Sequence, residues 1–174
     1  MPRYHGGPEH TSLERFRLTA QPESIALASL AAQAADEKKG EDILVIDVSN
    51  RLAIIDCFVI VTGDNERHVQ SIVDEVEDHL AENGTKPLRR EGRGEGLWVL
   101  LDYGDVVVHV QRRAEREYYA LDRLFLDAPQ IEVEGVEQVD RGANWDPDAE
   151  VDVLDVQTID DLPLAGPEPD ADEL

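Results

Sequence analysis

The sequence predicts an α/β fold, a single domain in which a mixed sheet of about five strands carries helices on its faces. Two short runs, 43–48 and 54–61, are almost continuously apolar and β-branched, which is typical of strands covered on both sides. The segment 97–110 contains two further apolar runs joined by a Tyr-Gly turn, as in a β-hairpin. Between these pairs of strands, 64–84 has the period of an amphipathic crossover helix, which predicts a sheet with both parallel and antiparallel pairs.

Composition divides the 174 residues into three regions. Residues 1–22 mix Gly, Pro, His and Arg with little periodicity, so we expect a flexible leader. Residues 23–129 carry the periodic segments and form the predicted domain, which is long enough to bury a core. Residues 130–174 contain 15 acidic residues and one basic residue, with several prolines, and we expect a disordered acidic tail.

The first predicted element is an alanine-rich helix at 24–38, which stops near Gly40 and leads into the two buried strands. The second helix follows them, and either Asp64 or Asn65 can cap its first turn. Its apolar positions fall on one helical stripe: Val69, Ile72, Val73, Val76 and Leu80.

A weaker strand is expected at 86–90, where Pro87 favours the edge of a sheet because proline cannot donate a ladder hydrogen bond. The hairpin follows, and a last helix is expected at 114–125. The predicted order is therefore helix, strand, strand, helix, three strands and helix.

The hairpin is apolar on both sides. Leu97, Val99 and Leu101 point to one face of the sheet because side chains alternate along a strand. Trp98 and Leu100 point to the other face. Either helices bury both faces or a partner covers one of them, so Trp98 is a core residue or an interface residue.

The chain has 39 acidic and 16 basic residues, a formal charge of −23. Direct binding to nucleic acid is not expected, because that affinity comes largely from lysine and arginine. The charge suits a basic protein partner, or it simply keeps the protein soluble. No apolar run is long enough for a membrane span, and no signal peptide is recognisable, so we expect a cytoplasmic protein. The lone cysteine, Cys57, agrees with a reducing compartment.

Signals for chemistry are few. The five histidines lack the short spacings of metal sites, and Gly92, Gly94 and Gly96 match neither the dinucleotide nor the phosphate-loop motif. Asp47 and Asp56 could form a magnesium-binding carboxylate pair, although strand-end or turn-capping roles fit them better. We predict no metal, no cofactor and no catalytic residue.

Motifs with a family-like order run through residues 24–129. They are Asp47-Val48-Ser49, Ile55-Asp56-Cys57-Phe58-Val59-Ile60, Thr62-Gly63, Arg67-His68-Val69, Arg90-Glu91-Gly92, Trp98-Val99-Leu100-Leu101-Asp102-Tyr103-Gly104-Asp105, Val108-His109-Val110 and Arg116-Glu117-Tyr118-Tyr119-Ala120-Leu121-Asp122-Arg123-Leu124-Phe125. This series closely resembles the ribosomal silencing factor family, also called the Iojap-like family. Gln111 departs from it, since members commonly have an aromatic residue there, and so does Phe125, where tryptophan is usual.

The resemblance implies a fold similar to nucleotidyltransferases without their catalytic motif, and a non-enzymatic role. Members bind the large ribosomal subunit through the fourteenth large-subunit ribosomal protein, on the face that meets the small subunit. The resemblance therefore implies a protein that blocks subunit joining and represses translation when nutrients are scarce.

The family's contact residues carry over to the Trp98 strand and the turn that follows it. The resemblance implies Trp98 as an apolar anchor, Tyr103 as a rim aromatic, and acidic residues as steering groups for a basic partner. The candidate binding residues are Glu91, Glu95, Trp98, Leu100, Asp102, Tyr103, Gly104 and Asp105.

Two other functions stay open at this point. One is a large-subunit assembly factor, which would use the same binding face. The other is an enzyme that keeps nucleotidyltransferase chemistry at Asp47 and Asp56. A homodimer away from the ribosome also fits the sequence.

Overall fold

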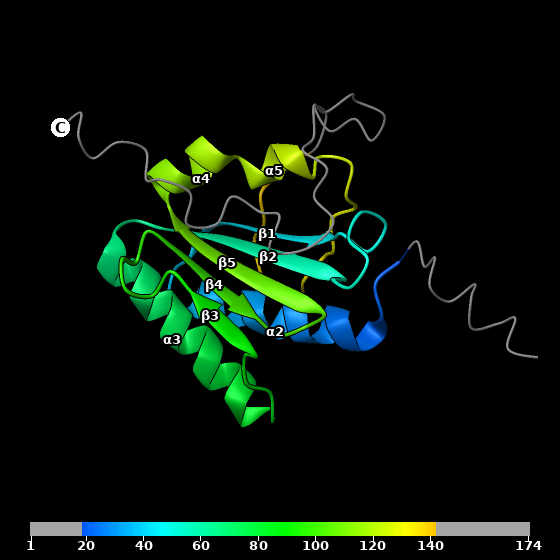
Figure 1. The fold of residues 1–174 in the computed structure, drawn as a ribbon, viewed down its shortest axis with the longest axis horizontal. Coiled ribbons are helices and arrows are strands. Elements are labelled where there is room, and N and C mark those ends of the chain that lie inside the picture. Colours follow the sequence, from blue (N-terminus) through cyan, green and yellow to red (C-terminus); the bar gives the residue numbers. More distant parts are fainter. Residues whose placement is uncertain (1–18, 142–174) are drawn as a thin grey trace, which may run out of the picture.

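The computed structural model describes residues 19–141, and it confirms the α/β fold with a five-stranded mixed sheet (Figure 1). The elements are α2 (Pro22–Glu37), β1 (Glu41–Asp47), β2 (Cys57–Gly63), α3 (Glu66–Glu82), β3 (Arg89–Glu91), β4 (Trp98–Asp102), β5 (Val106–Arg112), α4 (Arg113–Tyr119) and α5 (Leu121–Leu124). This order agrees with the predicted one, except that the last helix is divided in two. Among the described residues, no helix has the length and apolar character needed to cross a bilayer.

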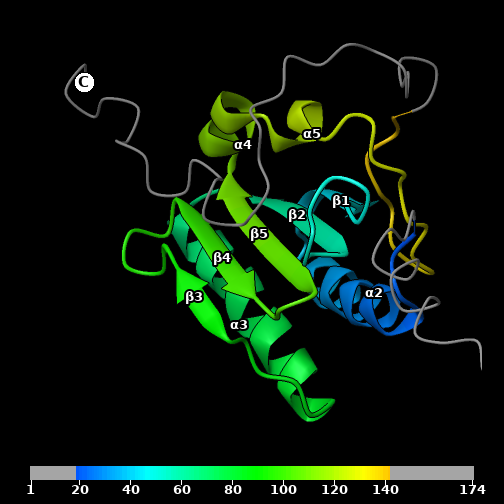
Figure 2. The same ribbon diagram turned by 45° about the vertical axis from the view of Figure 1, so that its right-hand side comes forward.

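The strands lie side by side in the order β1-β2-β5-β4-β3, and only the β2–β5 pair is parallel. The crossover between β2 and β5 includes α3 and the two edge-side strands, as Figure 2 shows. β2 and β5 therefore lie inside the sheet, which explains why their sequences are apolar at almost every position.

Helices α2 and α3 cover one face of the sheet (Figure 1). Alanines of α2 are fully buried there, so its backbone packs close to β1 and β2. The predicted stripe of α3 is buried against the same face, and Asn65 caps this helix by accepting a hydrogen bond from the His68 amide at 2.8 Å.

The opposite face is covered by α4, α5 and the segments that join them to the sheet (Figure 1). The chain between them turns at Ala120, which has φ 48° in the left-handed region. This turn redirects the chain so that Leu121 and Phe125 are buried over the sheet. A continuous helix at 114–125 was the wrong expectation because no glycine marks the break. Elements of the chain itself therefore cover both faces.

Two boundaries differ most from the sequence-based expectation. β2 begins at Cys57, and Ile54 is 65% exposed in the preceding loop. β3 begins at Arg89, after Pro87, and forms the sheet edge as expected for a strand that follows a proline.

The packed region extends past Pro129, because residues 130–141 run beside β1. The amides of Ile131 and Val139 donate to the carbonyls of Val45 and Ile43, at 2.8 and 3.0 Å. Placing the start of the tail at 130 was therefore too early. The rest of that predicted tail, 142–174, and residues 1–18 of the predicted leader lie outside the described residues.

Gln138 holds this segment through its side chain. Its Oε1 accepts from the Val45 amide at 2.9 Å, and its Nε2 donates to the Ile131 carbonyl at 2.8 Å. Val133 is also buried, in the core formed with α2. Because much of this pairing uses glutamine side chains, the segment lacks the plain alternation by which a strand is recognised.

His109 occupies the centre of the face under α4 and α5. Its Nδ1 accepts a hydrogen bond from Trp98 Nε1 at 3.2 Å, and its ring packs against that of Phe58 in a T-shaped arrangement with centroids 4.6 Å apart. Burial lowers the pKa of His109 to about 3, with a further contribution from the positive charge of Arg116. His109 is therefore a neutral core residue at physiological pH.

We expect His109 to make the protein less stable as the pH falls below its ordinary pKa of 6.5. The unfolded chain then takes up a proton that the folded chain refuses, so unfolding becomes easier by about 1.4 kcal/mol per pH unit. Urea titrations of the wild type and His109→Gln between pH 7.5 and 5 measure this. Equal slopes against pH for the two proteins would contradict a neutral buried histidine.

A chain ending at Pro129 should be less stable than one ending at Arg141, by about 3 kcal/mol or more, because it loses the burial of Val133 and the bonds to β1. Thermal and urea unfolding of the two truncated proteins measure the difference. Equal stabilities would mean that residues 130–141 contribute nothing to the domain.

Candidate partner-binding surface

The eight predicted binding residues do not form one surface. Trp98 and Leu100 point toward α4 and α5, whereas Tyr103 belongs to the opposite core with α2 and α3. Glu91 and Glu95 lie on the edge strand and in the loop after it. The remaining three, Asp102, Gly104 and Asp105, lie at the turn between β4 and β5.

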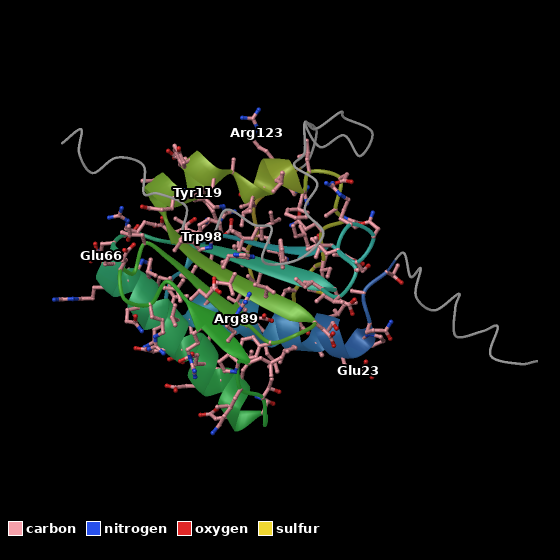
Figure 3. All side chains as sticks on the ribbon, viewed as in Figure 1. Glu23, Glu66, Arg89, Trp98, Tyr119 and Arg123 are labelled. Atoms are coloured by element: carbon pink, nitrogen blue, oxygen red, sulfur yellow. The ribbon has the colours of Figure 1, made fainter. Side chains whose placement is uncertain are left out.

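Trp98 is 8% exposed, and Leu100 is fully buried. The Trp98 indole packs against the ring of Tyr119 from α4, with centroids 4.8 Å apart (Figure 3). In this arrangement α4 covers the tryptophan, and a partner meets only its rim.

Tyr103 is 8% exposed and packs against the α3 side of the sheet. Burial raises the pKa of its hydroxyl, and the negative charge of Glu77 raises it further. Among the described residues, the hydroxyl has no hydrogen-bond partner. Tyr103 therefore lies on the opposite face of the sheet from Trp98, and not on a rim beside it as expected.

Both outer glutamates remain accessible. Glu91 is half-buried and forms an ion pair with Arg89 at 3.3 Å, while Glu95 is exposed in the loop between β3 and β4. Arg89 and Trp98 mark the two neighbouring strands in Figure 3. The glutamates thus flank the start of β4, at the opposite end of that strand from the turn.

The turn after β4 is held from within. Asp102 Oδ1 accepts a hydrogen bond from the Gly104 amide at 2.8 Å, and Gly104 has φ 91°, which only glycine adopts without strain. The carbonyl of Asp105 accepts from the amides of Asp56 and Cys57, at 2.7 and 3.1 Å. These bonds fasten the turn to the loop that precedes β2.

An exposed leucine that the sequence did not single out lies beside this turn. Leu88 is 78% exposed, and its amide donates to the carbonyl of Asp102 at 2.7 Å. A Cβ atom added to Gly104 would lie 3.5 Å from Leu88 Cδ1. The sequence signal that could have indicated the exposure of Leu88 is its position directly after Pro87, next to an expected edge strand. We call Leu88, Asp102, Gly104 and Asp105 the turn surface.

The turn surface is acidic, and one of its two carboxylates, Asp102, forms an ion pair with Arg89 at 3.9 Å. Asp105 lies at the surface, but partial desolvation by its surroundings raises the pKa of its carboxyl. The nearby carboxylates of Asp56 and Glu23 raise that pKa further. A positive charge placed beside these three groups would relieve their repulsion. Leu88 adds an exposed apolar contact next to them, so this end of the sheet can bind a basic partner.

Asp47 and Asp56 hold the start of α2. Asp47 accepts from the Ala20 amide at 2.7 Å, and Asp56 accepts from the Gln21 amide at 3.0 Å and the Ser24 hydroxyl at 2.8 Å. Carboxylates at a helix N-terminus are stabilised by its unpaired amides and its dipole. A structural role therefore accounts for both residues.

Cys57 is buried, and burial raises its thiol pKa to about 12, with further contributions from Asp47 and Asp56. A thiol with so high a pKa is a poor nucleophile, which agrees with a structural role.

The spacing of residues in the sequence did not reveal one cluster of two glutamates and a histidine. Within residues 19–141, Glu37, Glu75 and His79 bring potential ligand atoms within 4.8 Å of one another. The two ring nitrogens of His79 lie 3.3 Å from Glu75 and 3.5 Å from Glu37, while Lys38 lies 3.8 Å from Glu75. Contacts within α3, and between α3 and the end of α2, account for this arrangement.

Comparison with known proteins finds both a family match and similar individual proteins. Residues 21–158 match the family model described as "Ribosomal silencing factor during starvation". Ribosomal silencing factor RsfS of Bacillus subtilis is 43% identical over 104 residues, which cover 60% of this chain and 88% of the relative.

Two crystal structures have the same fold. A protein of Chromobacterium violaceum matches with a TM-score of 0.57 and 32% identity, covering 70% of this chain and 97% of its own. One from Bacillus halodurans matches with a TM-score of 0.55 and 38% identity, covering 62% and 98%. The chain therefore belongs to the ribosomal silencing factor family.

Proposed function

We propose that this protein binds the large ribosomal subunit through the fourteenth large-subunit ribosomal protein, on the face that meets the small subunit. Bound there, it keeps the subunits apart by occupying the space and so represses translation under nutrient limitation. Membership of the family supports the ribosomal role. The acidic turn surface is the observation that carries the mode of binding.

The chemistry of the turn surface fits a partner rich in lysine and arginine. Partial burial and then the carboxylates of Asp56 and Glu23 raise the pKa of Asp105, so a cationic side chain gains more there than at an isolated carboxylate. Leu88 is exposed beside it and offers the apolar contact that complements charge at the centre of an interface. Long-range attraction between the acidic chain and a basic protein also accelerates their encounter.

This mechanism has no chemical step. The two carboxylates that a nucleotidyltransferase would use are engaged with backbone amides before α2. Blocking depends only on affinity and on the volume of the bound protein, so the strength of repression follows occupancy of the subunit.

Replacing Leu88 by alanine should weaken binding to isolated large subunits about tenfold, because an exposed apolar anchor is lost. Asp105→Asn should weaken it several-fold and reduce the dependence of affinity on salt. Co-sedimentation with large subunits, small subunits and joined ribosomes, at two salt concentrations, measures both effects.

Asp36→Asn is the matched control for this experiment, because Asp36 is exposed at the far end of α2 from the turn surface. It removes the same charge and should bind like the wild type. Wild-type affinity in both Leu88→Ala and Asp105→Asn would exclude the turn surface. Failure of the wild type to bind the large subunit would refute the proposed function itself.

Asp56→Ala should lower the free energy of unfolding by about 1–2 kcal/mol, because the Gln21 amide and the Ser24 hydroxyl lose their acceptor. Neither this variant nor the wild type should bind ATP in the presence of magnesium. Chemical denaturation and calorimetric titration measure the two quantities. Magnesium-dependent nucleotide binding that Asp56→Ala abolishes would favour the enzyme hypothesis instead.

A further inference from the structure

The chain enters the described domain among carboxylates. Asp47 and Asp56 accept hydrogen bonds from the amides of Ala20 and Gln21, at 2.7 and 3.0 Å. Glu23 follows in the first turn of α2, where Figure 3 labels it. Because these bonds fix the backbone at residues 20 and 21, the chain ahead of them starts beside three negative charges.

Two of these carboxylates adjoin the turn surface. The Asp56 amide donates to the carbonyl of Asp105 at 2.7 Å, so two hydrogen bonds connect Gln21 to the turn. Partial burial raises the pKa of Asp105, and the charges of Asp56 and Glu23 raise it further. Within residues 19–141, no lysine or arginine forms an ion pair with any of these three carboxylates. Their negative charge is therefore available to a cation from outside the described residues.

Exposed apolar side chains flank this end of the sheet. Leu88 is 78% exposed beside Gly104, and Ile54 is 65% exposed in the loop that leads to Asp56. A contact between a cation and an exposed carboxylate contributes little by itself, so apolar groups next to the charge matter for affinity. The surface therefore suits a segment that carries positive charge and apolar side chains together.

The chain immediately ahead of the domain has this composition. Residues 13–18 read Leu-Glu-Arg-Phe-Arg-Leu, with two arginines, one glutamate and three apolar residues. They lie outside the described residues. Arg17 is three positions before Ala20, a Cα separation of at most about 11 Å in extended chain, and Arg15 is five positions before it. Both guanidinium groups are therefore within reach of the carboxylates around the entry point.

We propose that residues 13–18 fold back on the turn surface and occupy the site that binds the basic ribosomal protein. This inference rests on the proposed function. The two arginines contact the carboxylates of Asp105 and Glu23. The phenyl ring of Phe16 covers Leu88. Because the segment is tethered only a few residues away, its effective concentration at the surface is on the order of millimolar or higher. The docked form does not bind the ribosomal protein, so docking reduces the apparent affinity in proportion to the occupied fraction.

Removing the two positive charges should free the surface. Arg15→Gln combined with Arg17→Gln, in the full chain, should bind large subunits about fivefold more tightly than the wild type, because each exposed contact between an arginine and a carboxylate is modest. Co-sedimentation at low salt measures this gain.

The matched control is Lys39→Gln combined with Arg67→Gln, which removes the same charge from two exposed side chains. These residues lie where the end of α2 meets the start of α3, as the 2.7 Å contact of His68 Nε2 with the Lys38 carbonyl shows. That is the end of β2 away from the turn surface. The affinity of the control should change far less, and its change measures the effect of overall charge.

A spin label reports the docking without the ribosome. Cys57 is buried, so a nitroxide reagent reacts selectively with the thiol of Ser12→Cys. Paramagnetic broadening of the amide signals of Leu88, Gly104 and Asp105 should be stronger with the native segment than with the two arginines replaced by glutamine. The tether is identical in the two labelled proteins, so the difference measures docking. High salt should remove this difference, because it screens exposed charges.

Equal broadening in the two labelled proteins at low salt would overturn the docking, whatever the affinities are. If the broadening differs but the arginine variant gains no more affinity than the control, the segment does not occupy the partner's site, and the inference fails while the proposed function stands. If none of the proteins binds large subunits, the proposed function and its blockage by the segment fail together.

Discussion

The parallel pairing of β2 with β5 is the constraint on which the rest of the structure depends. Two parallel neighbours in the middle of a sheet require a crossover, and that crossover provides α3 for one face. Because both strands are apolar on both sides, the opposite face also needs a cover. That cover consists of α4, α5 and their connections after β5, together with the loop between β1 and β2.

The two layers differ in how they are stabilised. The α2–α3 layer packs alanine, valine, leucine and isoleucine side chains against the sheet, so its contribution comes from apolar burial. In the other layer, Phe58 and Phe125 form such a core at one end, whereas Arg116, Thr62 and Gln111 meet at the other. The two layers therefore owe their stability to different interactions, apolar burial on one side and a mixture of apolar burial and charged hydrogen bonds on the other.

Periodicity in the sequence predicted most of the fold, because apolar alternation and the helical stripe report burial directly. It did not predict the turn at Ala120, since alanine carries no signal for a left-handed backbone. It also missed residues 130–141, where the side chain of Gln138 replaces part of a strand ladder. Tertiary contacts specify both features, and neither is encoded in local propensity.

The candidate site was predicted less well, for a different reason. Tyr103 has the same parity as Val99 and Leu101, so alternation along β4 already assigned it to the face away from Trp98. Grouping these residues by their closeness in the sequence overlooked that parity. The acidic environment of Asp105 could not be inferred locally, because Asp56 and Glu23 come from other segments and meet it only in the folded chain.

The anchoring of residues 20 and 21 by Asp47 and Asp56 fixes where the N-terminal part of the chain enters the domain. Asp56 is also bonded through its amide to Asp105, so that entry point adjoins the turn surface. The first described residues therefore adjoin the acidic end of the sheet, so a cationic group attached at residue 19 would compete there with a basic ligand.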